Sequence, residues 1–438
     1  MTVRPSFVAL ALVLGLSGCG TWFGESEEPK LPGQRVSVML LDEGPRADAR
    51  LAGLAVVLPP PETNADWPQS GGVPSHVPGH LAVADTIDRA WSAGIGAGSS
   101  GRERLLASPV VAQGRVFTID SEGMVSAFSA SDGSRAWTAQ PEDLEPVDRL
   151  GGGGIAWIDG KVMAAFSHGD VVALDAASGT EVWRQRLRAP VRTNPAVADG
   201  KVFVVSADNQ LFTLSAATGE ILWRHAGTFE QAALLGGAAP AIDGNTVIVA
   251  YSSGEVYALN LADGRPLWSE ALLRPRRTLA IGSITDIVGD PVIDGDRVIV
   301  AGNGGEMAAF DLLRGNRAWD VQLTSRETPL VVGDFIFVVT DRNEVVCILR
   351  QGGHIRWVSP LVRTEEGKTP EPQRWAGPVL AGDRLILVGS TGEVASMSPY
   401  SGELLGRADL GGPVTLPPVV AGGTVFFLTD GGELLAYR

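Results

Sequence analysis

The sequence predicts an all-β protein that folds as an eight-bladed β-propeller of four-stranded antiparallel blades. Three observations support this fold class. A hairpin-like pattern recurs seven times along the chain, a turn glycine precedes each copy at a nearly constant distance, and the last repeat lacks a strand that is present upstream of the first. Repeats of about 40 to 50 residues are typical of propeller blades.

The repeat is clearest at 173–183, which reads Ala-Leu-Asp-Ala-Ala-Ser-Gly-Thr-Glu-Val-Trp. Each copy has a short apolar run, a turn with a glycine, and a second run that ends in a large aromatic residue. This order is typical of a β-hairpin. The other copies span 127–137, 213–223, 258–268, 309–319 and, more loosely, 347–357 and 396–406.

The spacing inside each repeat is nearly fixed. A turn glycine precedes the tryptophan by 23 or 24 residues, as in the pairs Gly160 and Trp183 or Gly295 and Trp319. Three short strands and two turns fit into that interval, and the apolar run before the glycine supplies a fourth strand. Four antiparallel strands make one blade. We expect the tryptophans to pack between neighbouring blades.

The two ends of the repeat region complete each other. The last repeat starts at Pro418, and the sequence ends at Arg438, before a fourth strand. Residues 89–91 repeat the Arg-Ala-Trp triplet of 135–137, so we expect 86–93 to form the outer strand of the C-terminal blade, which would leave no open edge. Gly406 replaces the tryptophan in one repeat, and we expect that blade to be less well packed.

The N-terminus has the features of a targeting segment. Arg4 precedes an apolar run at 7–16, which is too short to span a bilayer. Leu16-Ser17-Gly18-Cys19 follows and resembles the bacterial lipobox. We therefore expect residues 1–18 to be a lipoprotein signal peptide and Cys19 to be lipidated, the alternative being an ordinary secretory signal. Because residue 20 is not aspartate, the resemblance implies the periplasmic face of the outer membrane of a Gram-negative bacterium.

Two further domain assignments follow. Residues 19–85 lack the repeat and contain turn formers such as the prolines at 59–61, so we interpret them as a mostly linker-like tether. Residues 86–438 are the propeller. A net charge of −15 argues against nucleic-acid binding, and two cysteines exclude a disulfide framework. We find no catalytic motif and no metal-ligand spacing, and expect no enzyme activity, cofactor or metal.

The connections between repeats vary in length, whereas the repeats do not. In a propeller these connections lie on one face, which is our candidate binding face. Two of them are basic in an acidic protein. One contains the arginines between 184 and 192, and the other contains Arg274, Arg276 and Arg277. They are either solvated arginines or a patch for an acidic partner.

The Ala-Leu-Asp-x-x-x-Gly-x-x-x-Trp repeats of 86–438 resemble the propeller of pyrroloquinoline-quinone dehydrogenases. The same repeats behind a lipobox resemble the BamB family of outer-membrane β-barrel assembly proteins. That resemblance implies a non-catalytic scaffold that binds the periplasmic domains of the barrel-inserting subunit and assists β-barrel folding and insertion, with nascent outer-membrane proteins as a further partner. The only membrane contact it implies is the lipid anchor.

The resemblance also implies contact residues on the candidate face. Leu234 and Asp286 match family contact positions, whereas Leu235 and Val288 differ from the family's arginine and acidic residue. Because Asp286 lies outside the predicted strands, we expect Asp286→Arg to weaken partner binding without changing the melting temperature.

Two other functions remain open at this stage. A quinone-dependent dehydrogenase would need a carboxylate base, calcium ligands and usually adjacent cysteines, and the sequence has no adjacent pair. A periplasmic propeller that binds a polymer or peptide is the other alternative.

Overall fold

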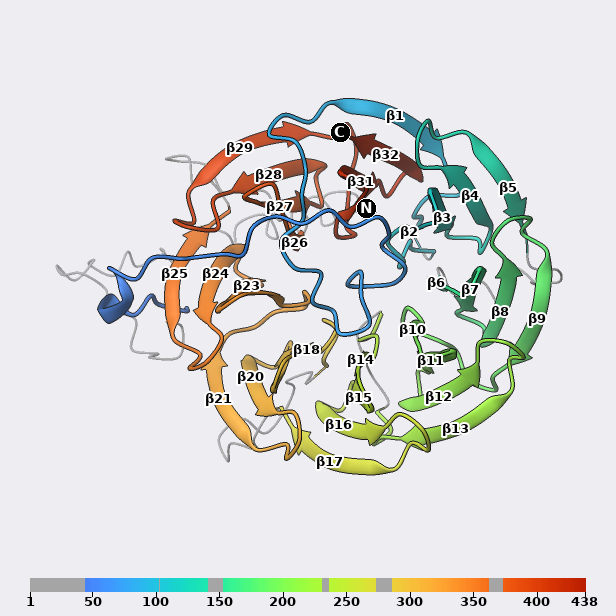
Figure 1. Ribbon diagram of the computed structural model, residues 1–438, viewed down its shortest axis with the longest axis horizontal. Coiled ribbons are helices and arrows are strands. Elements are labelled where there is room, and N and C mark those ends of the chain that lie inside the picture. Colours follow the sequence, from blue (N-terminus) through green and yellow to red (C-terminus); the bar gives the residue numbers. More distant parts are fainter. Residues whose placement is uncertain (1–43, 102, 141–152, 231–235, 273–285, 362–372) are drawn as a thin grey trace, which may run out of the picture. The chain divides into compact units, whose positions relative to one another are not determined.

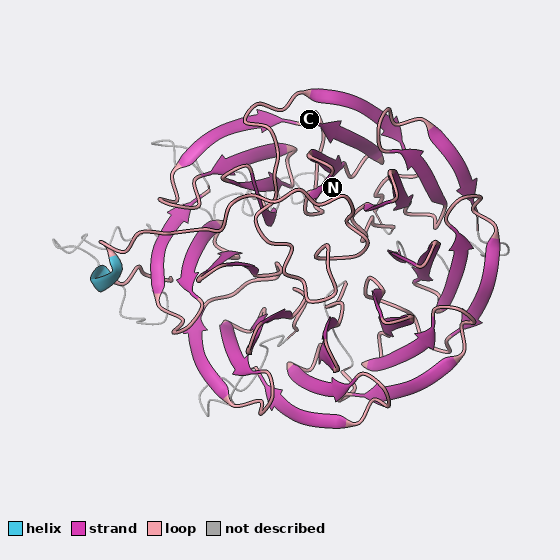
Figure 2. Ribbon diagram, in the orientation of Figure 1, coloured by secondary structure: helices cyan, strands magenta, loops and turns pink. Residues whose placement is uncertain are grey.

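The computed structural model describes residues 44–101, 103–140, 153–230, 236–272, 286–361 and 373–438. These residues belong to one compact unit, Gly44–Arg438. Their strands form eight four-stranded sheets arranged in a ring (Figure 1). One short 3-10 helix, η1 (Ala49–Leu51), is the only helix in the described part of the chain (Figure 2). The predicted eight-bladed propeller is confirmed.

The blades are numbered in chain order, and their strands run from the inside of the ring outward. Blades 1 to 4 contain β2 (Val110–Ala112), β3 (Arg115–Ile119), β4 (Val125–Ser129) and β5 (Arg135–Ala139); β6 (Gly153–Ile158), β7 (Lys161–Phe166), β8 (Asp170–Asp175) and β9 (Glu181–Arg186); β10 (Ala196–Ala198), β11 (Lys201–Val205), β12 (Gln210–Ser215) and β13 (Ile221–Ala226); and β14 (Ala241–Asp243), β15 (Thr246–Ala250), β16 (Glu255–Asn260) and β17 (Pro266–Ala271).

Blades 5 to 7 follow the same plan. They contain β18 (Val292–Asp294), β19 (Arg297–Ala301), β20 (Glu306–Asp311) and β21 (Arg317–Gln322); β22 (Leu330–Val332), β23 (Phe335–Val339), β24 (Glu344–Leu349) and β25 (Ile355–Pro360); and β26 (Trp375–Ala381), β27 (Arg384–Gly389), β28 (Glu393–Met397) and β29 (Leu404–Asp409).

Blade 8 combines both ends of the described chain. Its three inner strands are β30 (Val419–Ala421), β31 (Thr424–Leu428) and β32 (Glu433–Tyr437), and its outer strand is β1 (Arg89–Gly94). β1 pairs antiparallel with β32, with Trp91 opposite Ala436. The ring is thus joined by backbone hydrogen bonds between segments more than 300 residues apart.

Burial explains why these residues form strands. The second and third strands of each blade are almost wholly buried between neighbouring blades, as in β7, whereas the outer strands alternate between exposed and half-buried positions, as in β13. The turns between the first two strands are tight. Asp199 and Gly200 connect β10 to β11, and both have a positive φ, as a type I′ hairpin turn requires.

Seven tryptophans join neighbouring blades by one repeated contact. Trp223 in β13 donates its indole hydrogen to the carbonyl of Leu261 in blade 4, 3.2 Å away. Its ring covers Gly264, where an added Cβ would lie 2.4 Å from the indole. The turn glycine of one blade is therefore needed by the tryptophan of the blade before it. The same pairing recurs for Trp91, Trp137, Trp183, Trp268, Trp319 and Trp357 with Gly133, Gly179, Gly219, Gly315, Gly353 and Gly402.

The eighth junction differs, and it explains Gly406. A tryptophan there would face blade 8, whose outer strand, β1, comes from upstream and not from the segment after the third strand, β32. Blade 8 thus lacks the turn that carries the glycine in the other blades. A Cβ added at Gly406 would meet nothing within 4 Å. Gly406 is exposed, and its junction lacks the tryptophan contact of the other seven. That this blade is less well packed stays a prediction.

Residues 44–85 differ from the predicted linker. They run along the propeller and across the centre of the ring (Figure 1), and their backbone and side chains hydrogen-bond to seven inner strands. The contacts follow the ring in order: Asn64 with Val420, Trp67 with Val111, Pro68 with Trp157, Gln69 with Val197, Pro74 with Ile242, Ser75 with Ile293, and Leu81 with Leu380. We call residues 62–82 the axial segment.

Candidate functional site

The antiparallel strand order places all connections from an outer strand to the next inner strand on one face of the ring. We call it the connection face. It includes the connections 227–240 and 272–291, which join blades 3, 4 and 5, and the turns between the second and third strands. The turns between the first two strands, such as the one at Asn245, lie on the opposite face.

The predicted lipidation site, Cys19, lies outside the described residues. So do five of the six predicted contact residues, namely Leu234, Leu235, Arg274, Arg276 and Arg277. Of the predicted contacts, only Asp286 has a described position.

Asp286 is buried, with 2% of its surface exposed. Together with Arg192 and Gly236 it lines a small cavity of about 10 Å³ between the connections. Burial lowers the pKa of Arg192, and the nearby negative charge of Asp286 opposes that shift. The carbonyl of Asp286 accepts a hydrogen bond from the Asn303 backbone. The expectation that Asp286→Arg would leave the melting temperature unchanged assumed an exposed side chain, whereas the structure buries it. We therefore expect an arginine at this position to lower the melting temperature.

The structure adds a contact candidate that our sequence analysis missed. Phe229 lies on the connection after β13 and is 63% exposed. The preceding residue, Thr228, is fixed by two hydrogen bonds to Glu255, of 2.8 Å and 3.0 Å. The carbonyl of Thr228 also accepts a hydrogen bond from the Asn209 side chain. Phe229 is thus an exposed aromatic residue whose preceding residue is held in place by hydrogen bonds. Aromatic residues are enriched at protein interfaces, so Phe229 is a candidate contact.

Two of the four arginines between 184 and 192 lie in β9 and pair with carboxylates of their own blade. Arg184 forms ion pairs with Asp170 and Glu181, at 3.1 Å and 2.6 Å. Arg186 lies 3.5 Å from the same Asp170 carboxylate. Arg184 is thus paired inside blade 2, whereas the Arg186 side chain remains 75% exposed.

The centre of the connection face is hollow. A cavity of about 490 Å³, which we call the vestibule, is lined by residues at or shortly before the start of the inner strand in each of the eight blades, and by Ser70 of the axial segment. Four arginines line it, namely Arg104, Arg192, Arg326 and Arg374, with two acidic residues, Asp290 and Glu327. The vestibule is therefore arginine-rich in a protein of net charge −15.

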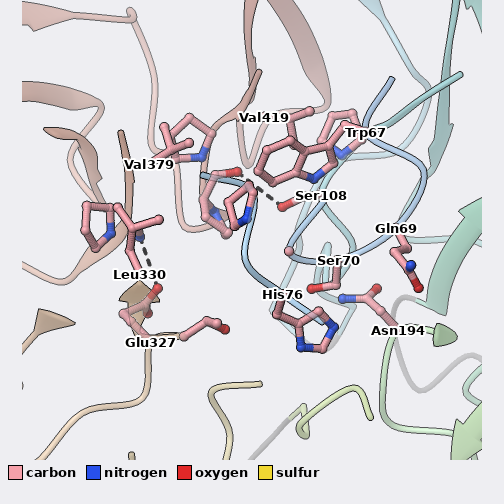
Figure 3. Close-up of a pocket in the computed structure, with 18 of the residues that line it drawn as sticks. Trp67, Gln69, Ser70, His76, Ser108, Asn194, Glu327, Leu330, Val379 and Val419 are labelled. Carbon is pink, nitrogen blue, oxygen red and sulfur yellow. Dashed lines mark hydrogen bonds between the residues drawn. The ribbon is translucent and has the colours of Figure 1, made fainter. Parts of the chain in front are cut away.

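A smaller cavity of about 90 Å³ adjoins the vestibule, and we call it the chamber. Ser70, Ser108, Asn194, Glu327, Thr328 and Pro417 line both spaces. The apolar wall of the chamber comes from Trp67, Leu330, Val379 and Val419, and His76 lies at its edge (Figure 3).

The two carboxylates near the chamber have defined roles. Asp290 accepts hydrogen bonds from the Ser70 hydroxyl, at 2.6 Å, and from the Ala239 backbone, at 2.7 Å. It thereby links the axial segment to blade 4. Burial raises the pKa of Glu327 to about 7, helped by the charge of Asp290 and opposed by the Gly377 backbone hydrogen bond.

Membrane-spanning helices and clustered metal ligands are both absent from the described residues. In that part of the chain, no helix is long and apolar enough to cross a membrane. No group of three or more His, Cys, Asp or Glu side chains among the same residues is placed to hold a metal ion.

The ring defines the chain as an eight-bladed β-propeller. Its fold is similar to that of quinohemoprotein alcohol dehydrogenase from Comamonas testosteroni, with a TM-score of 0.65 and 15% identity over 85% of this chain and 80% of that one. The BamB structure from Moraxella catarrhalis is similar too, with a TM-score of 0.67 and 21% identity over 81% of this chain and 100% of that one. At these identities, both likenesses concern the fold alone.

Sequence comparison gives the family. The model described as outer membrane protein assembly factor BamB matches residues 65–175, 148–359 and 364–438. The outer membrane protein assembly factor BamB of Xanthomonas campestris pv. campestris is 29% identical over 362 residues, which cover 80% of this chain and 86% of that protein. The chain belongs to the BamB family.

Proposed function

We propose that this chain is a non-catalytic scaffold lipoprotein of the outer-membrane protein assembly machinery. It binds the periplasmic domains of the barrel-inserting subunit through the connections 227–240 and 272–291, and so assists β-barrel folding and insertion. Membership of a family named for outer-membrane protein assembly supports the role. Nascent outer-membrane proteins are a further partner in this proposal.

The observation that carries the docking site is the exposed Phe229 on its anchored base. It shares its connection with Leu234 and Leu235, and the next connection supplies Arg274, Arg276 and Arg277. An aromatic anchor with neighbouring arginines matches the residue types that dominate interface energies. Asp286 acts in this proposal as a support between the two connections rather than as a contact.

Co-purification from detergent-solubilised envelopes tests the docking site. Phe229→Ser should lower the yield of the barrel-inserting subunit at least about tenfold. A double charge reversal at Arg276 and Arg277 should lower it as well and make the remaining binding less sensitive to salt. Asn245→Arg, on the opposite face, is the matched control. Equal losses for Asn245→Arg and Phe229→Ser would place the partner elsewhere.

The anchor is tested separately. We propose that Cys19 is lipidated and holds the protein at the periplasmic face of the outer membrane. Cys19→Ala should then release the protein from the membrane fraction and remove the mass of the acyl chains, because several chains on one residue are needed for a stable anchor. A variant that stays in the outer membrane with unchanged mass contradicts the assignment.

A further inference from the structure

The vestibule contains arginines that the described part of the chain does not neutralise. Arg104 and Arg374 are exposed, and neither side chain forms a hydrogen bond or an ion pair with another described residue. Arg326 donates one hydrogen bond, from its Nε to the Asn303 side chain at 2.9 Å. The two terminal nitrogens of its guanidinium can still bind a carboxylate as a fork.

The two acidic residues of the vestibule are already engaged inside the protein. Asp290 accepts hydrogen bonds from the Ser70 hydroxyl and the Ala239 backbone. Glu327 accepts a hydrogen bond from the Gly377 backbone at 3.1 Å, and burial raises its pKa to about 7, so it is ionised in about half of the molecules at pH 7. The vestibule is therefore a positive site in a chain of net charge −15.

The vestibule arginines approach the cavity from different blades. Arg326 lies shortly before β22 of blade 6, and Arg374 directly before β26 of blade 7. Both are close enough to Glu327 for their charges to oppose the rise of its pKa. Arg104 comes from the segment before β2 of blade 1. A cavity of about 490 Å³ with arginines from three blades can meet several carboxylates of one polypeptide segment.

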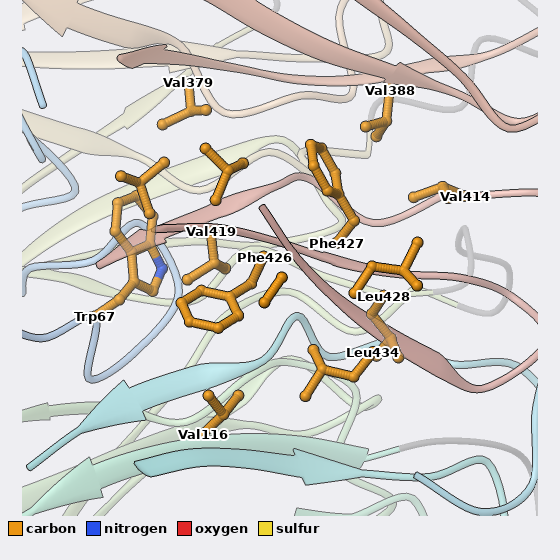
Figure 4. Packing of buried hydrophobic residues seen from close by; sticks show 14 of the residues in the cluster. Trp67, Val116, Val379, Val388, Val414, Val419, Phe426, Phe427, Leu428 and Leu434 are labelled. Atoms are coloured by element: carbon orange, nitrogen blue, oxygen red, sulfur yellow. The ribbon is translucent and has the colours of Figure 1, made fainter. Parts of the chain in front are cut away.

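The backbone under the exposed arginines is fixed by the hydrophobic core. Leu105, which follows Arg104, is 3% exposed and belongs to the same cluster as Ala376 and Val414 (Figure 4). Ala376 lies two residues after Arg374, and Val414 directly precedes the residues of blade 8 that line the vestibule. A wall that is already ordered lowers the entropic cost of binding.

The vestibule is continuous with the proposed docking site. Gly236 and Gly237 of the connection 227–240 line its wall, as do Val288 and Gly289 of the connection 272–291. A partner that binds these two connections therefore stands beside the mouth of the vestibule. Any part of that partner that extends toward the axis of the ring would enter it.

We propose that the vestibule receives an acidic loop of the partner that docks on the connection face, with successive carboxylates of the loop bound by Arg326, Arg374 and Arg104. This inference rests on the proposed function and adds a polar contact to the docking through Phe229. The acidic surface elsewhere on the protein repels such a loop, so the arginines also fix where it binds.

A peptide separates the vestibule from the rest of the interface. The probe is a fluorescein-labelled peptide of six glutamates, and a peptide of six glutamines is its uncharged match. The full chain in detergent is titrated at low salt and followed by fluorescence anisotropy. The glutamate peptide should bind at least about tenfold more tightly than the glutamine peptide.

Single variants assign this binding to the vestibule. Arg326→Gln and Arg374→Gln should each weaken the glutamate peptide about tenfold. Arg265→Gln, an exposed arginine in a turn on the opposite face, is the matched control and should leave the affinity unchanged. Because Arg374 is exposed and has no internal partner among the described residues, its variant keeps the test informative if Arg326→Gln does not fold.

Co-purification then connects the peptide to the partner. The double variant Arg326→Gln and Arg374→Gln should lower the yield of the barrel-inserting subunit about tenfold. Phe229→Ser should lower that yield too, but should bind the glutamate peptide as tightly as the unmodified protein does.

Three outcomes overturn the inference. If the glutamate peptide does not bind, or if Arg265→Gln weakens it as much as Arg374→Gln, the vestibule is not an acidic-loop site, and a loss with Phe229→Ser still supports the docking proposal. If inorganic phosphate at equal concentration displaces the peptide completely, the site takes small anions instead of a loop. If neither Phe229→Ser nor the double arginine variant changes the yield of the subunit, the docking proposal fails and this inference fails with it.

Discussion

The rim and the axis of this propeller are held together in opposite ways. At the rim, seven junctions repeat one contact, a tryptophan over the turn glycine of the next blade. At the axis, the axial segment meets seven inner strands, each through a different residue. Rim contacts are equivalent and each joins two neighbours, whereas the axial segment joins nearly the whole ring. We therefore expect a substitution at the rim to destabilise only the two blades that it joins. A change in the axial segment should destabilise nearly the whole ring.

Replacement of the axial segment by a Gly/Ser linker of equal length should have the largest effect. It removes the buried side chains of Trp67 and Leu81 and leaves inner-strand groups without partners. Each large buried side chain contributes about 2–5 kcal/mol, so the loss should exceed about 5 kcal/mol. Urea unfolding followed by tryptophan fluorescence measures it. A midpoint equal to that of the unmodified protein would show that the ring needs no axial support.

Trp223→Ala should destabilise the protein by about 3 kcal/mol, the lower end of the usual cost of removing a large aromatic side chain, because Trp223 is half-buried. It opens a cavity over Gly264 and removes the hydrogen bond to Leu261. Thermal and urea unfolding measure the loss, and hydrogen exchange should show it confined to blades 3 and 4. Faster exchange in all blades would contradict the local character of rim contacts.

Asp290→Ala should cost about 2–3 kcal/mol, because it leaves the Ser70 hydroxyl and the buried Ala239 amide without their acceptor. Asp296→Ala, at an exposed turn on the opposite face, is the matched control and should cost less than about 1 kcal/mol, since it loses one surface ion pair. Equal unfolding midpoints for the two variants would show that the hydrogen bonds of Asp290 to the axial segment and blade 4 add no stability.

Glu327→Gln should stabilise the protein in a pH-dependent way, by up to roughly 2 kcal/mol. The folded pKa of about 7 lies above the ordinary value of 4.5, so the folded state holds its proton more tightly than the unfolded state. The unmodified protein therefore loses stability as pH rises from about 4.5 to 7, and the glutamine variant does not. Melting temperatures at pH 4.5 and pH 8 test this. A constant difference between the two proteins would contradict a raised pKa.

Gly406→Trp should have the smallest effect, below about 0.5 kcal/mol, as for a surface substitution. The position has open space but no glycine turn opposite it. A clear gain in melting temperature would show that the eighth junction can be closed like the others.

In the candidate site, too, features set by the repeat could be predicted, whereas features set by contacts between blades could not. The connection face follows from the variable spacing between repeats, but the role of Asp286 does not. Its position outside the strands suggested exposure, whereas the structure buries it near Arg192. Phe229 carries a signal, since it is the one aromatic residue in the connection 227–240, but its anchoring through Glu255 depends on a strand of the next blade.

The sequence by itself determined the eight blades and the rim. Tryptophan, turn glycine and strand spacing belong to one repeat, so their pattern is local and recurs along the chain. Only the tertiary structure decided the axis, the vestibule and the chamber. Their contacts join residues far apart, such as Gln69 and Val197 or His76 and Pro291, 128 and 215 positions apart. No period in the sequence marks such pairs, because each is formed once and depends on the closed ring around it.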